Sequence, residues 1–291
     1  MSATPPDPGT FTSGESGHVS GLRQVAVRTV ADRALDLAGR LRGTGRRLDR
    51  LAARNPPRRV LALSVYRPGA PLAPAVAREL SRSRHDVRLA FASTGAADPA
   101  LADATVLTDL AGGKFPNMNR ILEALEEEAG AFDWILVVDD DVRLPPCFLD
   151  RFLALCEAFA LDLAQPAQTL RSHAAWRVTR RRARPLLRRT RFVEIGPVTA
   201  FGPRATAALM PFPELRFGWG LELHWAARAE EENWRLGIAD ALPVRHELSP
   251  VGSTYGHDDA VAEAQRFLTG RPFLSSTAAQ ETLEAHGRLP G

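Results

Sequence analysis

Three consecutive carboxylates, Asp139, Asp140 and Asp141, directly follow a short apolar run in the middle of the chain. The run, Trp134–Val138, is rich in β-branched side chains and predicts a strand that is buried on both faces of a sheet. Carboxylates crowded at the end of such a strand repel one another unless a cation, backbone amides or solvent relieves them. A divalent cation is the strongest relief, because Mg²⁺ and Mn²⁺ take oxygen ligands. The sequence therefore predicts a metal site where this strand ends.

The order of the three carboxylates indicates which of them hold the metal. Asp139 and Asp141 occupy alternate positions and point to one side, whereas Asp140 faces elsewhere or holds the loop. His246 ends the last predicted strand, and a neutral imidazole there would complete the coordination. The plainer alternative is that the aspartates only solvate a turn and cap the next helix, and that His246 is a surface histidine.

The segments around the aspartates alternate between strand and helix patterns. Strands are predicted over residues 59–66, 85–93, 104–108, 134–138, 161–166, 192–201 and 237–244, and helices over 71–81, 117–129, 144–160, 204–210 and 218–236. This alternation predicts an α/β fold with a mainly parallel sheet flanked by helices. Ligands of open α/β sheets bind outside the carboxyl ends of the strands, where the aspartates are expected.

The remaining segments differ from this central domain, which we place at residues 56–260. Residues 1–20 have the composition of a disordered tail. Residues 21–55 predict a basic amphipathic helical segment with a break at Gly43-Thr44-Gly45. This segment either lies on an anionic membrane or an acidic partner, or packs beside the domain as a solvated helix. Residues 261–291 are predicted as a peripheral C-terminal helical segment, with a closing helix over 277–286.

Composition excludes several classes of protein. The formal net charge is +3, but the basic residues are concentrated in a few segments, above all residues 177–191. Cys147 and Cys156 are the only cysteines, which fits a reducing cytoplasm and neither a disulfide framework nor a zinc site. We find no apolar run long enough for a membrane span and no signal peptide. We therefore expect a cytoplasmic protein, with peripheral contact at the inner face of the membrane through its basic segments.

The pieces around the aspartates together resemble the GT-A fold glycosyltransferases, whose sheet is Rossmann-like and whose donors are nucleotide-diphosphate sugars. The resemblance spans about residues 59–257 and depends on four segments in order: Gly112-Gly113-Lys114 with Asn117 and Asn119; Asp139 with Asp141; Gly218-Trp219-Gly220-Leu221-Glu222; and His246. The third segment, with Gly237-Ile238-Ala239-Asp240 and the strand-terminal histidine, is closer still to a poorly characterised GT-A-like family of plants and bacteria. Because that family is poorly characterised, the closer likeness supports the prediction of the fold more than the prediction of the reaction.

The resemblance implies a hexosyltransferase-type enzyme that moves a sugar from a nucleotide donor to a hydroxyl acceptor. It implies Asp139, Asp141 and His246 as ligands of Mn²⁺ or Mg²⁺, Lys114, Asn117, Asp139 and Asp140 as donor-binding residues, and Glu222 as the general base. One departure is that Leu223 and His224 follow Glu222, where galactosyltransferase-type enzymes carry consecutive acids. The sugar, the nucleotide and the acceptor, including a lipid-linked or anionic one, stay open.

Two other functions compete with this interpretation. Haloacid-dehalogenase-like phosphatases also place Asp-x-Asp after an apolar strand, but here Val142-Arg143 follows in place of their usual Thr-bearing continuation. A GT-A-like chain without turnover could bind anionic ligands through the arginines of residues 177–191, which are otherwise a solvated, mobile loop. Nucleic acid is not an expected partner, because few aromatic residues for base stacking accompany those arginines.

Overall fold

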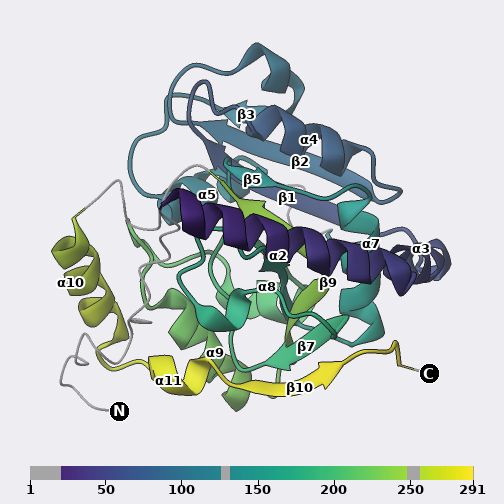
Figure 1. Ribbon diagram of the computed structural model, residues 1–291. Helices are drawn as coiled ribbons and strands as arrows, with labels where there is room; N and C mark the ends of the chain where they lie inside the picture. Colours follow the sequence, from purple (N-terminus) through teal and green to yellow (C-terminus); the bar gives the residue numbers. More distant parts are fainter. Residues whose placement is uncertain (1–20, 126–131, 248–255, 291) are drawn as a thin grey trace.

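The computed structural model describes residues 21–125, 132–247 and 256–290, which build one sheet with helices on both faces (Figure 1). The predicted tail, residues 1–20, and the end of the helix predicted over 117–129 lie outside the described residues. The strands are β1 (Arg59–Tyr66), β2 (Asp86–Ser93), β3 (Thr105–Leu107), β4 (Trp134–Val138), β5 (Val142–Arg143), β6 (Leu163–Gln168), β7 (Leu187–Thr190), β8 (Val198–Phe201), β9 (Leu236–His246) and β10 (Thr282–His286). The α-helices are α2 (Leu22–Leu41), α3 (Thr44–Arg54), α4 (Ala73–Ser81), α5 (Lys114–Ala124), α7 (Phe148–Ala158), α8 (Pro203–Leu209), α9 (Leu221–Glu231), α10 (His257–Leu268) and α11 (Ser276–Ala279), with short 3₁₀ turns η1 (Pro99–Ala104) and η2 (Arg177–Thr179).

The sheet confirms the predicted α/β architecture. Its strand order is β10-β7-β9-β6-β8-β4-β1-β2-β3, with β5 paired to β9. The strands β3, β2, β1 and β4 are parallel neighbours, and β6 and β9 are parallel to each other. β8 lies antiparallel between β4 and β6, so that β6 and β9 run in the direction of β4. The carboxyl ends of β4, β6 and β9 therefore meet at one edge of the sheet.

The alternation of side chains along β1 and β4 divides the core into two layers. Leu61, Leu63, Ile135 and Val137 face one apolar cluster, to which α5, α8 and α9 contribute. Val60, Ala62, Leu136 and Val138 face the other, which α3, α4 and α7 cover. All five residues of β4 are buried, as its continuous apolar run predicts. The two layers hold the end of β4 in place, and the three aspartates follow it.

The N-terminal segment forms two helices with a break between them, as predicted. Gly43 has a left-handed backbone with φ 67° at the start of α3, which suits a glycine between two helices. α3 buries Leu48 and Ala52 against the layer that contains α7. α2 crosses one face of the molecule in Figure 1 and runs beside the loops at the carboxyl edge of the sheet.

The arginine-rich segment, residues 177–191, is only in part the solvated loop that its composition indicates, since residues 182–184 are exposed and irregular but both ends of the segment are ordered. Near its end the segment forms β7, which pairs antiparallel with β9 in the interior of the sheet. Arg188 has no exposed surface, because its guanidinium forms an ion pair of 2.7 Å with the buried Asp240. The same guanidinium donates to the carbonyls of Val178 and Arg180 at 2.7 and 3.0 Å. This arginine holds the segment to the domain and is not available to an external anion.

The C-terminal end differs from the helix predicted over residues 277–286. Only Ser276–Ala279 is helical, and Thr282–His286 is the strand β10. Its residues, Thr-Leu-Glu-Ala-His, include good helix formers, but β10 pairs antiparallel with β7. The open edge of β7 offers backbone partners that outweigh the local preference for helix. The division of the chain into the four predicted segments remains a prediction.

Candidate functional site

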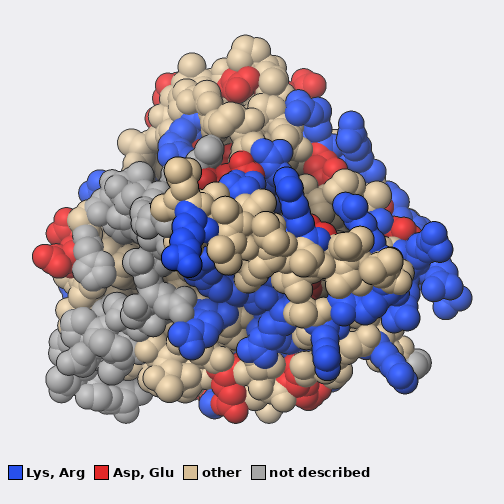
Figure 2. Space-filling model, viewed as in Figure 1, with Lys and Arg blue, Asp and Glu red and all other residues tan. Residues whose placement is uncertain are grey.

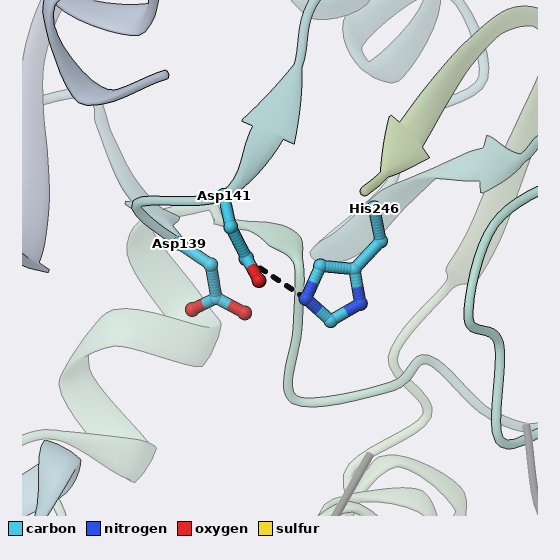
Figure 3. A group of neighbouring side chains, drawn as sticks. All are labelled: Asp139, Asp141 and His246. Atoms are coloured by element: carbon cyan, nitrogen blue, oxygen red, sulfur yellow. Dashed lines mark ion pairs between the residues drawn. The ribbon is translucent and has the colours of Figure 1, made fainter. Parts of the chain in front are cut away.

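The short strand β5 brings the predicted metal ligands together. Asp141 immediately precedes β5, and β5 pairs with the end of β9 so that Val142 lies opposite His246. The ligand atoms of Asp139, Asp141 and His246 all lie within 4.8 Å of one another (Figure 3). Two carboxylates and one imidazole offer the oxygen and nitrogen donors that Mn²⁺ and similar divalent cations bind. The residues present therefore fit a divalent cation.

Each of the three consecutive carboxylates has its own cationic partner. Lys114 Nζ lies 2.5 Å from Asp139 Oδ1, and His246 Nε2 lies 2.9 Å from Asp141 Oδ1. Asp140 accepts three hydrogen bonds from Arg67, one from its backbone N–H at 3.0 Å and two from its guanidinium at 3.1 and 3.2 Å. Asp140 thus holds the loop that follows β1, and its carboxylate is not among the clustered ligand atoms.

Asp141 and His246 change each other's pKa. Burial lowers the pKa of His246, but the hydrogen bond and charge of Asp141, with the charges of Asp139 and Glu194, outweigh it and raise the pKa to about 9. Burial in turn raises the pKa of Asp141, but the hydrogen bond and charge of His246 outweigh it, so this pKa is lowered. At neutral pH the metal-free pair is therefore a carboxylate and an imidazolium.

Metal binding is expected to release a proton from this pair. A metal ligand must be a neutral imidazole, so a cation competes with the His246 proton below pH 9. The apparent association constant for Mn²⁺ should rise about tenfold per pH unit between pH 6 and pH 8. Calorimetric titration in two buffers of different ionisation enthalpy measures the released proton. An affinity that does not change over this range would contradict the assignment of His246, and His246→Asn should remove the dependence.

Gly196 allows the segment before β8 to approach the aspartates. A Cβ atom at this position would lie 2.7 Å from Asp139 Oδ2 and 3.5 Å from Lys114 Nζ. Lys114 also donates to the carbonyl of Ile195 at 3.3 Å, and the backbone N–H of Asp139 donates to the carbonyl of Pro197 at 2.8 Å. Residues 195–197 therefore form one wall of the site, and any larger residue at 196 would displace the Asp139 carboxylate.

Glu222 lies in the first turn of α9 and is only 6% exposed. Its Oε2 atom has no hydrogen-bond partner among the described residues. Burial raises its pKa to about 7, against the opposing effect of hydrogen bonds from its own backbone N–H and from the Trp176 side chain. A buried carboxyl group with a pKa near 7 is suited to accept a proton at neutral pH.

A second buried acid, Glu194, was not predicted from the sequence. It is 8% exposed, and Gln168 Nε2 donates to its Oε2 at 2.6 Å. Burial and the charge of Glu222 raise its pKa to about 8, although the nearby His246 opposes them. The sequence signal is a single acid within the apolar run Phe192-Val193-Glu194-Ile195. This run belongs to the strand predicted over residues 192–201, whereas β8 begins only at Val198. Glu194 thus links Glu222 electrostatically to the predicted metal ligands.

The predicted donor-binding residues of α5 occupy different environments. Lys114, at the first position of α5, reaches the aspartates. Asn117 is buried and its Oδ1 accepts a hydrogen bond from Arg120 at 3.1 Å. Asn119 holds the loop before α9, because its amide donates to the carbonyl of Phe212 and accepts from the backbone N–H of the same residue, both at 2.8 Å. Of these three side chains, only Lys114 contacts the predicted metal ligands.

The loop after β6 positions His246 from the other side. The backbone N–H of His246 donates to Ser172 Oγ at 3.2 Å, and its Nδ1 lies 3.4 Å from the carbonyl oxygen of His173. If Nδ1 carries a proton directed at this carbonyl, Nε2 is free for a cation. The same loop contacts α2, since the backbone N–H groups of Leu170 and Arg171 donate to Asp32.

Solved structures match the chain, whereas no family model and no curated protein does. GalNAc-T7, solved with UDP, GalNAc and Mn²⁺, has a TM-score of 0.50 and is 8% identical; the match covers 72% of this chain and 47% of that one. The chain has the GT-A fold. TarS residues 1–349 from S. aureus, solved with UDP-GlcNAc, matches with a TM-score of 0.49, 14% identity and coverage of 72% and 65%. The mannosyltransferase PcManGT from Pyrobaculum calidifontis, solved with GDP-Man and Mn²⁺, matches with a TM-score of 0.44, 14% identity and coverage of 74% and 67%.

The GT-A fold confirms the architecture that the sequence resemblance implies. The chain spans about half the length of GalNAc-T7 and about two thirds of the other two. Within the GT-A fold of this chain, the cluster of Asp139, Asp141 and His246 lies at the carboxyl edge of the sheet, where α/β sheets bind their ligands.

Proposed function

We propose that this protein is a metal-dependent glycosyltransferase that moves a hexose from a nucleotide-diphosphate sugar to a hydroxyl acceptor. The observation that carries the proposal is the cluster of Asp139, Asp141 and His246 at the carboxyl edge of a GT-A sheet. GalNAc-T7, which shares the fold, was solved with a nucleotide and Mn²⁺. A site that holds a divalent cation at this edge suits a donor whose leaving group is a diphosphate.

Asp139, Asp141 and His246 would hold the cation, Mn²⁺ or Mg²⁺. When bound, a divalent cation there offsets the negative charge that develops on the departing nucleoside diphosphate. Lys114 already lies against Asp139 and supplies a second positive charge beside the same carboxylates. Its ammonium group would pair with a phosphate oxygen once the cation neutralises Asp139. Asp140 supports the site indirectly, by fixing Arg67 and the loop after β1.

Glu222 would take the proton from the acceptor hydroxyl. Its pKa of about 7 leaves a substantial fraction of carboxylate at neutral pH and lets it hold the proton after transfer. Its Oε2 atom is buried and has no hydrogen-bond partner among the described residues, so an acceptor hydroxyl that reached it would meet an unused hydrogen-bond acceptor. Glu194, whose pKa is about 8, stays largely protonated at neutral pH. The neutral Glu194 therefore adds little repulsion to the negatively charged form of Glu222 that the reaction needs.

Release of nucleotide from activated sugars tests the proposal. Wild-type protein is incubated with UDP-, GDP- and dTDP-hexoses, with Mn²⁺ and with a chelator, and nucleoside diphosphate is measured. We expect metal-dependent release with one nucleotide, and a loss of at least about 1000-fold in Asp141→Ala, because both the cation and the partner of His246 are lost. Asp103→Ala, which removes an exposed acid of η1, should behave as wild type. Equal release with and without metal, or in Asp141→Ala, would contradict the proposal.

A further inference from the structure

The helix α2 packs on the domain through a polar face and turns its apolar face outward. Its one buried residue is Asp32, whose carboxylate accepts hydrogen bonds from the backbone N–H groups of Leu170 and Arg171 at 3.0 and 3.1 Å. The large exposed apolar side chains of the described residues lie almost entirely on α2: Leu22 (91%), Val27 (61%), Val30 (67%), Leu37 (56%) and Leu41 (81%). Surface helices normally bury this face. Neither core cluster contains an α2 side chain.

Four of these five apolar side chains form a stripe along the helix. Val27, Val30, Leu37 and Leu41 are separated by three, seven and four residues, spacings that return to one side of an α-helix. Arg28 and Asp32, which contact the domain, lie on the opposite side. Contiguous exposed apolar surface of this kind marks an interaction site. The fold of the described domain leaves the stripe without a covering element.

The surroundings of the stripe are strongly basic. Residues 22–54 contain nine arginines and three aspartates. All three aspartates pair with arginines from outside the segment, Asp32 and Asp36 with Arg181 and Asp49 with Arg151. Figure 2 shows Lys and Arg side chains gathered on the face that α2 crosses, with uncharged surface between them. The exposed arginines of the segment are Arg23, Arg33, Arg40, Arg42, Arg46, Arg47, Arg50 and Arg54. Within the described part of the chain, the charge around the stripe is therefore positive.

We infer that the outward face of α2 docks on a membrane surface that contains anionic lipids. An apolar stripe with arginines beside it is the arrangement of helices that lie in the plane of a bilayer, with apolar side chains among the acyl chains and cations at the headgroups. A guanidinium binds phosphate through two parallel hydrogen bonds, which suits phospholipid headgroups. No helix within residues 21–125, 132–247 or 256–290 is long and apolar enough to cross a bilayer. The contact is thus with the surface of the membrane.

The docked orientation would place the candidate metal site beside the membrane. Asp32 of α2 holds Leu170 and Arg171, and Ser172 of the same loop accepts the backbone N–H of His246. A hydroxyl acceptor anchored in the same bilayer would then lie next to the carboxyl edge of the sheet. This choice of acceptor rests on the proposed function, whereas the docking itself does not.

Vesicle binding without any substrate tests the docking surface. Full-length protein is sedimented with vesicles of phosphatidylcholine alone and with vesicles that contain one third phosphatidylglycerol. We expect binding to the anionic vesicles, and a partition coefficient at least about tenfold lower in Leu37→Gln/Leu41→Gln, because two apolar side chains no longer enter the bilayer. In Arg33→Gln/Arg40→Gln/Arg46→Gln the partition coefficient for anionic vesicles should fall on the order of 100-fold, because three cations near the headgroups are lost. All five positions are exposed, so the fold, checked by circular dichroism, should be unchanged.

The matched control replaces exposed residues elsewhere. Leu283→Gln/Arg235→Gln changes an exposed leucine of β10 and an exposed arginine before β9 and should bind as wild type. The inference is overturned if wild-type protein does not bind anionic vesicles, or if the α2 variants bind as tightly as the control. It is also overturned if sedimentation velocity shows a dimer that Leu37→Gln/Leu41→Gln dissociates, since a second copy would then cover the stripe. None of these results bears on nucleotide release in solution, which tests the proposed function separately.

Discussion

Replacing Glu222 by glutamine is expected to reduce sugar transfer at least about 100-fold while leaving donor binding within about twofold of wild type. Glutamine has nearly the same shape as the carboxyl group but cannot accept the acceptor's proton. The donor site is formed by different residues, so nucleotide affinity should be retained. Steady-state transfer and equilibrium nucleotide binding, measured on the same preparation, separate the two effects. Near-normal transfer by Glu222→Gln would exclude Glu222 as the base.

The same variant is expected to be more stable than wild type above neutral pH. In the folded chain burial raises the pKa of Glu222 from 4.5 to about 7. The folded state therefore holds this proton more tightly than the unfolded state, and stability is lost as the pH rises from about 4 to 7. The loss is at most about 3 kcal/mol. Glu222→Gln should avoid this loss at pH 8 and equal wild type near pH 4 in denaturant unfolding.

A control variant, and the result expected if Glu222 has only a structural role, complete this test. Glu231→Gln, at an exposed position of the same helix, should change neither transfer nor the pH dependence of unfolding. If Glu222 were instead a structural acid stabilised by hydrogen bonds to its charged form, glutamine would destabilise the protein at pH 8. A carboxylate that costs stability where it is charged is typical of a residue kept for function.

Replacing Arg188 by methionine is expected to lower the free energy of unfolding by about 3–5 kcal/mol. The change removes an ion pair in which neither side chain has exposed surface, and it leaves Asp240 buried without its guanidinium partner. It also leaves the carbonyls of Val178 and Arg180 without their donor. Urea unfolding measures the effect.

Two further variants distinguish loss of the buried ion pair from a non-specific loss of stability caused by any arginine-to-methionine substitution. Arg188→Met/Asp240→Leu removes both charges and should recover much of the stability, because an apolar pair can replace a buried ion pair of similar volume. Arg228→Met removes partly exposed pairs with Glu231 and Glu232 on α9 and should cost less than about 1 kcal/mol. A loss below about 1 kcal/mol in Arg188→Met would show that the buried pair does not hold this segment in place.

The sequence predicts the parts of the fold in which local pattern and tertiary structure agree. The strand predicted over residues 59–66 is β1 with the same bounds, because a mostly apolar run suits a strand in the interior of a sheet. The break at Gly43 is predicted because glycine readily adopts the left-handed backbone that this position has. By contrast, Thr282–His286 has residues that favour helix, and only the open edge of β7 makes it a strand.

The predicted site residues come together through features that have no sequence signal of their own. β5 is two residues long, yet its pairing with β9 sets the distance between Asp141 and His246. Glu194 is a single acid in an apolar run, and only the tertiary structure places it beside Gln168 and Glu222. For α2, the spacing of apolar residues predicts an amphipathic helix but not which face meets the domain. Hydrogen bonds to Asp32 decide that the polar face is buried.

A thermal-shift titration with nucleoside diphosphates tests the central claim, a metal-dependent nucleotide site at Asp139, Asp141 and His246, most directly. Wild-type protein and Asp141→Ala are heated with UDP, GDP, CDP, dTDP or ADP, each with and without Mn²⁺. A ligand at a hundredfold excess over its dissociation constant stabilises the folded state by about 2.7 kcal/mol. We predict that one nucleotide raises the melting temperature of wild type only with Mn²⁺ and has no effect on Asp141→Ala. A shift that needs no metal or survives in Asp141→Ala, or the absence of any shift, would contradict the account.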